Sequence, residues 1–83
     1  MQRPSSSAGR KRERAFGRVL HEVRTEKGLS QEQLGFESGY HRTYISFLER
    51  GKKNPTLATI MDLADTLGVP AWELIRKVEV RLK

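Results

Sequence analysis

The sequence contains no cysteine, only three prolines, and no long run of apolar residues. Without cysteine there is neither a disulfide framework nor a thiolate metal site, and His21 and His41 lie too far apart for typical metal-ligand spacing. The apolar runs are far shorter than the roughly 20 residues that span a bilayer, and the Met1 end lacks an apolar signal core. We therefore expect a cytoplasmic protein with no membrane contact, no metal or other cofactor and no small-molecule ligand.

Positive charge is what the sequence has in excess. Sixteen lysines and arginines against ten acidic residues give a net charge of +6 in 83 residues, a length that suits one domain with a small core. Five of these basic residues and a single acidic residue, Glu13, lie within the first 14 positions. Such a stretch suits a polyanion, but basic tails also occur as solvated, disordered ends, and the charge alone does not decide between them.

The pattern along the chain predicts an irregular, basic N-terminal arm over residues 1–11 and a single helical domain over residues 12–83. Pro, Ser and Gly without apolar periodicity mark the arm. Apolar residues at helical spacing predict a first helix over residues 12–27, with Gly28 as its stop. These apolar residues are Phe16, Val19, Leu20 and Val23.

Two short helices follow. Ser30 and Gln33 form the S-x-x-Q pattern of a capping box, which predicts a helix over residues 31–38, and a further helix is expected over residues 42–50. A glycine follows each helix, at Gly39 and Gly51.

Two more helices complete an all-α fold without strands. Thr56 caps the fourth helix, Gly68 ends it, and Pro70 is expected in the first turn of the fifth. The apolar stripe expected to face the core from the fifth helix consists of Trp72, Ile75, Val78 and Leu82, and its exposed candidates for a partner chain are Leu74, Val80 and Leu82.

The second helix, a short turn with Gly39, and the third helix have the spacing of a helix-turn-helix, whose second helix enters the DNA major groove. A helical wheel places Ile45 and Leu48 on the inner side of residues 42–50. The outer side carries Thr43, Ser46, Phe47 and Arg50, with Arg42, Tyr44 and Glu49 on the borders.

Several of these outward residues suit contact with DNA. Arg42 lies in the first turn, where its guanidinium is able to make a bidentate contact to guanine. The hydroxyls of Thr43 and Ser46 suit close approach to phosphates or bases, and Tyr44 suits a phosphate or a thymine methyl. The alternative is an ordinary amphipathic helix with a solvated polar face.

Two residues are unexpected at their positions. Phe47 either packs under the basic arm or against the next loop, or touches a thymine methyl. His41 stands where Ser, Thr, Asp or Asn is favoured as a cap, and its expected role is a phosphate contact or plain solvation.

The segments "RTEKGLSQEQLG" and "RTYISFLERGKKNPTLATIMDLADTLGV" resemble the helix-turn-helix family of phage Cro and lambda repressor, the XRE-type regulators. Within that family, "RTYIS…ERG" is particularly similar to the controller proteins of restriction-modification systems. The resemblance covers about residues 13–75. It implies a compact five-helix lambda-repressor-like domain and a homodimer that reads a near-palindromic operator.

The resemblance also implies roles for individual residues. Gln31 would contact a phosphate at the start of the second helix, and Arg24 would form a structural ion pair with Glu49. The family usually has Ala where Gly35 stands, so we expect Gly35 to loosen its helix by up to about 1 kcal/mol. The groove-facing set would be Arg42, Thr43, Tyr44, Ser46 and Arg50, and the loop that grips the DNA backbone would contain Lys52, Lys53 and Asn54.

An enzyme is not expected, because the sequence has no nucleophile with a base, no metal cluster and no phosphate-binding loop. We predict a sequence-specific double-stranded DNA-binding transcriptional regulator that acts as a dimer. The alternatives are a protein-interaction module that uses the last helix, or a non-specific nucleic-acid binder that uses the basic arm. A general RNA binder fits the charge, but the sequence lacks the aromatic platform of a sheet-based reader.

Overall fold

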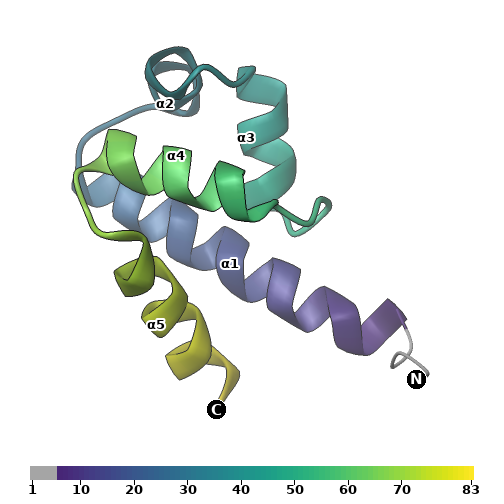
Figure 1. The fold of residues 1–83 in the computed structure, drawn as a ribbon. Coiled ribbons are helices and arrows are strands. Elements are labelled where there is room, and N and C mark those ends of the chain that lie inside the picture. The colour runs from purple at the N-terminus through teal and green to yellow at the C-terminus, as the bar shows by residue number, and fades with distance from the viewer. Residues whose placement is uncertain (1–5) are drawn as a thin grey trace.

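The computed structural model describes residues 6–83, and over these residues it consists of five α-helices joined by short connections (Figure 1). The helices are α1 (Ser6–Glu26), α2 (Gln31–Ser38), α3 (Arg42–Glu49), α4 (Leu57–Leu67) and α5 (Ala71–Leu82). The expected all-α, five-helix class is confirmed. None of the helices in this part of the chain is both long enough and apolar enough to cross a membrane.

The helix boundaries follow from local hydrogen bonds that the sequence predicts. The backbone N–H of Gln33 donates to Ser30 Oγ at 3.0 Å, and the Ser30 N–H donates to Gln33 Oε1 at 2.8 Å, which completes the capping box of α2. Gly39 ends α2 with a φ of 85°, a left-handed conformation in which a Cβ would be strained. At α4, Thr56 Oγ1 accepts from the Thr59 N–H at 3.1 Å.

Helix α1 begins at Ser6, earlier than the sequence predicts. The irregular arm expected over residues 1–11 is therefore wrong for residues 6–11, and its first five residues lie outside the described part of the chain. Arginine, lysine and alanine are good helix formers, which favours extension of the helix toward the N-terminus. Arg10 adds a tertiary contact, because its Nη1 donates to the carbonyl of Gly51 at 3.1 Å.

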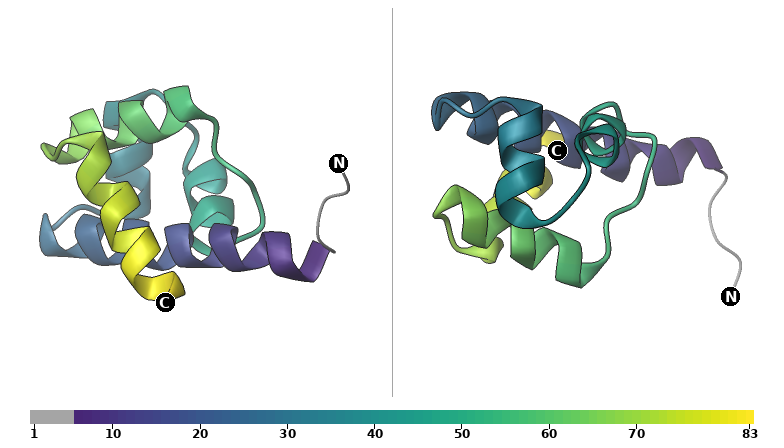
Figure 2. Two further views of the ribbon diagram at one scale, coloured as in Figure 1. Left: turned by 60° about the horizontal axis from the view of Figure 1, so that its bottom comes forward. Right: turned by 90° about the horizontal axis from the view of Figure 1, so that it is seen from above.

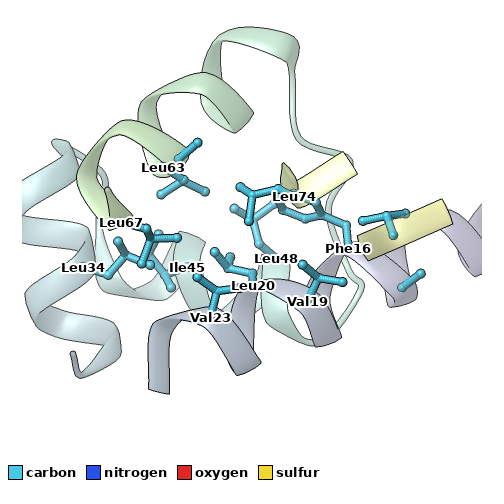
Figure 3. Packing of buried hydrophobic residues seen from close by; sticks show 13 residues of the cluster. Phe16, Val19, Leu20, Val23, Leu34, Ile45, Leu48, Leu63, Leu67 and Leu74 are labelled. Atoms are coloured by element: carbon cyan, nitrogen blue, oxygen red, sulfur yellow. The ribbon is translucent and has the colours of Figure 1, made fainter. Parts of the chain in front are cut away.

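All five helices contribute to one apolar core (Figure 3). Helix α1 packs against both α3 and α5, and α2 packs against α3 and α4. Leu20, Leu34 and Leu63 are completely buried, and each such side chain contributes about 1.5–3 kcal/mol relative to exposure. The other large side chains with almost no exposed surface are Val19, Ile45, Leu48 and Leu74. The inner side of α3 predicted by the helical wheel thus lies in the core.

The apolar stripe predicted for α5 is right at Val78 but wrong at Trp72, Ile75 and Leu82, which are exposed. Trp72 is 65% exposed and Ile75 is 39% exposed, whereas Leu74, expected on the surface, is completely buried. Leu74 and Val78 fall one turn apart on the face that meets α1 and α4. Pro70 is the N-cap residue and precedes the first turn. Because two adjacent apolar stripes are available on α5, periodicity alone could not identify the buried one.

Gly35 lies at a close contact between α2 and the turn that follows it. A Cβ at this position would meet the Tyr40 carbonyl oxygen at 2.6 Å, a distance that real Cβ atoms essentially never show. The expectation that Gly35 loosens its helix relative to alanine considered helix propensity alone and not this contact. Glycine here lets the turn fold back closely onto α2, which helps to fix the angle between α2 and α3.

Candidate nucleic-acid interface

The turn between α2 and α3 is short and internally bonded. It contains Gly39, Tyr40 and His41, and the Tyr40 N–H donates to the carbonyl of Gly35 at 2.8 Å. His41 caps α3 because its Nδ1 accepts from the Thr43 N–H at 3.0 Å. The ring therefore does what a Ser or Asn side chain usually does at this position. The predicted phosphate contact of the exposed His41 side chain stays a prediction.

The inner side of α3 is fixed by a buried ion pair as well as by apolar packing. Arg24 Nε donates to Glu49 Oε2 at 2.6 Å and Arg24 Nη2 donates to Glu49 Oε1 at 3.0 Å, so the pair implied by the family resemblance is present in the structure. Arg24 Nη1 also donates to the Leu29 carbonyl at 2.8 Å. The two side chains are 9% and 5% exposed. The pair therefore ties α1 to α3 in a place that water barely reaches.

Two further side chains complete the surroundings of the Glu49 carboxylate. Gln31 Nε2 donates to Glu49 Oε1 at 2.9 Å, and His21 Nδ1 lies 3.2 Å from the same oxygen. Burial alone would raise the pKa of the Glu49 carboxyl, but the hydrogen bonds from Arg24, Gln31 and His21 together lower it below its ordinary value. The hydrogen bond to Glu49 raises the pKa of Arg24.

This network changes the interpretation of two residues. The Gln31 amide, expected at a phosphate, is turned toward Glu49, so in this structure it supports α3, and its phosphate contact stays a prediction. His21 was not predicted from the sequence as a neighbour of Glu49. Only its position one helical turn before Arg24 could have suggested this contact.

The outer side of α3 has few contacts within the chain. Arg42 and Thr43 are exposed, and Ser46 is partly exposed. Arg42 Nη1 lies 3.7 Å from Glu32 Oε1, but both side chains are largely exposed, and such pairs contribute only about 0–1 kcal/mol. Arg42 is therefore able to leave Glu32 for a ligand at little cost. Tyr44, on the border of this side, is partly buried, with its ring centroid 5.4 Å from that of Tyr40.

Phe47 supports Arg50. The guanidinium carbon of Arg50 lies 5.1 Å from the centroid of the Phe47 ring, within the range of a cation–π interaction, and Arg50 Nε lies 3.4 Å from the Ser46 carbonyl oxygen. Phe47 is only partly exposed in this arrangement. The partners predicted for Phe47 from the sequence were the arm, the next loop and thymine, but not this arginine. The i,i+3 spacing of the two residues was the available signal.

The loop after α3 continues its exposed surface. Lys52, Lys53 and Asn54 are all exposed. The Lys52 N–H donates to the Phe47 carbonyl at 2.9 Å, which fixes the start of the loop against the end of α3. The predicted groove-facing residues thus run along the length of α3, and the predicted backbone-gripping loop follows directly at its C-terminal end.

Comparison with known proteins agrees with this geometry. The helix-turn-helix family model matches residues 20–73, from the last third of α1 to the start of α5. The HTH-type transcriptional regulator y4dJ of Sinorhizobium fredii, itself uncharacterized, is 49% identical over 53 residues, which are 64% of this chain and 69% of y4dJ.

Two solved structures are similar over most of the chain. The restriction-modification controller protein C.AhdI from Aeromonas hydrophila is 47% identical, with a TM-score of 0.73 over 75% of this chain and 94% of C.AhdI. The controller protein C.Esp1396I, a tetramer in complex with its natural 35 base-pair operator, is 32% identical, with a TM-score of 0.71 over 81% of this chain and 93% of its own. The resemblance to controller proteins is confirmed. This chain belongs to the helix-turn-helix family of the XRE type.

Proposed function

We propose that the protein is a sequence-specific transcriptional regulator that binds double-stranded DNA as a homodimer on a near-palindromic operator. The observation that carries this proposal is the division of α3 into a buried inner side, bonded through Glu49, and an outer side whose polar residues have few partners within the chain. A helix held in this way presents a fixed set of donors to the major groove. The similar controller protein C.Esp1396I, which is bound to its operator, supports the proposal.

The residues of the surface divide into base-reading and backbone-gripping roles. Arg42, in the first turn of α3, is assigned a bidentate contact to guanine, and Thr43 and Ser46 are assigned close contacts to bases or phosphates. Lys52 and Lys53 are assigned to phosphates, because exposed lysines in a loop neutralise backbone charge without reading sequence. Remaining members of the proposed surface are Gln31, His41, Tyr44, Phe47, Arg50 and Asn54.

The homodimer is assigned to α4 and α5. A groove of about 310 Å³ between α1, α4 and α5 has apolar walls, and exposed apolar side chains lie on both α4 and α5. Residues that line the groove include Phe16, Ile60, Ile75, Val78 and Leu82; the exposed ones include Leu57, Met61 and Trp72. A second copy would cover this surface, and a two-fold dimer is the arrangement that reads two half-sites about 34 Å apart.

The proposal also holds that the protein acts in the cytoplasm and that it regulates transcription without catalysing a reaction and without a cofactor. The alternatives, a protein-interaction module that uses α5 and a non-specific nucleic-acid binder, make different predictions for one experiment. Selection of binding sites from a random duplex library at near-physiological salt should retain a two-fold symmetric motif. Enrichment of no motif, or equal retention of RNA and DNA, would contradict sequence-specific DNA binding.

A further inference from the structure

A hollow of about 370 Å³ beside the C-terminal end of α3 is lined mainly by arginines. Arg14 and Arg18 come from α1, Arg50 follows α3, and Arg81 comes from α5. We call the site formed by these four arginines the arginine hollow. Its arginines come from distant parts of the sequence, and of the four only Arg50 belongs to the groove-facing surface predicted from the helix-turn-helix.

Carboxylates do not balance most of this positive charge. Arg81 Nη1 lies 3.2 Å from Glu22 Oε2, so this arginine has an acidic partner. Glu49 also lines the hollow, but its carboxylate is already bonded to Arg24. Within residues 10–83, no carboxylate oxygen lies within 4.0 Å of a nitrogen of the other three arginines, Arg14, Arg18 and Arg50. Three like charges around one hollow repel one another, and a bound anion would relieve that repulsion.

The close approach of α1 to α3 builds the hollow. A Cβ on Gly17 would lie 2.5 Å from the carbonyl oxygens of both Leu48 and Glu49, so only glycine lets α1 cross α3 at this distance. A Cβ on Gly51 would lie 2.7 Å from Cγ of Arg14. Two glycines thus set Arg14 and Arg18 beside the end of α3. In all three views the first turns of α1 extend beyond the other helices (Figures 1 and 2).

Basic residues link the groove-facing surface to α1. Arg50 belongs to both surfaces, and its position is fixed by the Phe47 ring. Arg10 is bonded to the Gly51 carbonyl, at the start of the loop that carries Lys52 and Lys53. A DNA strand gripped by this loop would therefore pass close to the arginines of α1, and guanidinium groups pair with phosphate through two parallel hydrogen bonds.

We propose that the arginine hollow binds a phosphate of the DNA backbone, which gives α1 a DNA contact separate from those of the helix-turn-helix and its loop. The inference rests on the proposed function, because the ligand is the DNA that α3 reads. The contact is independent of sequence: it adds affinity and fixes the position of the protein on the duplex, while α3 selects the site.

The test compares two double variants of equal charge change, Arg14→Gln with Arg18→Gln and, as control, Arg76→Gln with Lys83→Gln on and just after α5. Glutamine keeps the Cγ of Arg14 that packs on Gly51, and all four side chains are exposed. The hollow variant should bind operator and random duplexes more weakly by the same factor. Its slope of log K against log salt should fall by roughly 0.9 for each phosphate that a subunit no longer neutralises. The control should keep most of the wild-type slope.

Ethylation interference then locates the contact. One backbone phosphate per half-site should interfere with wild-type binding and stop interfering in the hollow variant. Equal salt slopes for the hollow and control variants, or an unchanged interference pattern, would overturn the inference. If the hollow variant bound only the operator more weakly and random duplex as the wild type does, the inference would also be overturned, because Arg14 and Arg18 would then read bases. If the wild type selects no motif, the proposed function fails, while the slopes on random duplex still decide the arginine contact.

Discussion

The two sides of α3 differ in how completely their polar groups are bonded within the chain. On the inner side, the Glu49 carboxylate has Arg24, Gln31 and His21 as partners and is almost fully buried. On the outer side, Arg42 pairs only loosely with Glu32: Arg42 Nη1 lies 3.7 Å from Glu32 Oε1, and both side chains are largely exposed. A buried charge that lost its partners would destabilise the fold, whereas an exposed arginine loses little when it changes partner.

This difference separates stability from recognition within one short helix. Changes on the inner side should lower the free energy of unfolding, and they should affect DNA binding only by shifting α3 or the α1 helix that packs on it. Changes on the outer side should alter DNA binding and leave the free energy of unfolding within about 0.5 kcal/mol of the wild type. Variants on each side of α3 test this separation.

The largest effect is expected for Arg24→Met on the inner side. Methionine keeps apolar volume but leaves the Glu49 carboxylate buried without its main partner, which should lower the free energy of unfolding by about 3–5 kcal/mol at neutral pH. Urea unfolding measures the change. Arg76→Met, at an exposed arginine of α5, is the matched control and should change stability by less than about 0.5 kcal/mol.

The pH dependence of the same variant identifies the cause. In the wild type, the lowered pKa of Glu49 stabilises the fold above the ordinary carboxyl pKa of about 4.5, and this stabilisation is lost as pH falls through the folded-state pKa. Without Arg24, burial raises that pKa, so protonation removes the unpaired charge. The deficit of the variant should therefore shrink between about pH 7 and about pH 4. An equal deficit at both pH values would show that the carboxylate is not its source.

Gly17→Ala should have the next largest effect on the inner side. The added methyl would meet two backbone carbonyl oxygens at 2.5 Å, so α1 has to move away from α3. The overpacking cost of about 1–3 kcal/mol should exceed the helix propensity that alanine adds. Because the same shift moves Arg14 and Arg18, the variant should also bind all DNA more weakly. Gly28→Ala is unsuitable as a control, because Gly28 has a positive φ that would strain an alanine. Ser38→Ala, at the end of α2, is used instead and should lower the free energy of unfolding less than Gly17→Ala does.

The sequence predicted the parts of the molecule that local signals determine. The capping box at Ser30 and Gln33 fixed the start of α2, and glycines after α2 and α4 fixed their ends. The inner and outer sides of α3 followed from the wheel, because only one apolar stripe is available there. The ion pair between Arg24 and Glu49 came from family resemblance, since no local pattern connects residues 25 positions apart.

The remaining features depend on distances between helices, which the sequence does not encode locally. Gly17 is an ordinary helix glycine until α3 crosses it, and Gly35 is costly only until the Tyr40 carbonyl approaches it. On α5, periodicity allowed two adjacent apolar stripes, and only packing against α1 and α4 buries Leu74 rather than Trp72. The arginine hollow requires α1, α3 and α5 to be in place before its residues become neighbours.

On the outer side, Arg42→Ala should reduce binding by about 1–3 kcal/mol at one base pair and relax the choice of base there. Site selection with the variant measures the relaxed position. Lys53→Ala is the matched control in the exposed loop, and it should weaken binding to operator and random DNA by the same factor. Equal weakening on operator and random DNA for Arg42→Ala would remove Arg42 from the base-reading set. Both variants should unfold like the wild type.

The smallest effect is expected for Phe47→Leu, which keeps apolar bulk but removes the ring beneath Arg50. A cation–π contact at an exposed site contributes about 0.5–1 kcal/mol, so binding should weaken by roughly two- to fivefold. If the ring acts only by fixing Arg50 for a phosphate, the weakening should be equal on operator and random duplexes, and Phe47→Trp should retain wild-type affinity. If Phe47 instead touches a thymine methyl, the weakening will be confined to operators that carry thymine at one position. The two duplexes therefore decide whether this outward aromatic residue reads DNA or supports the arginine that grips it.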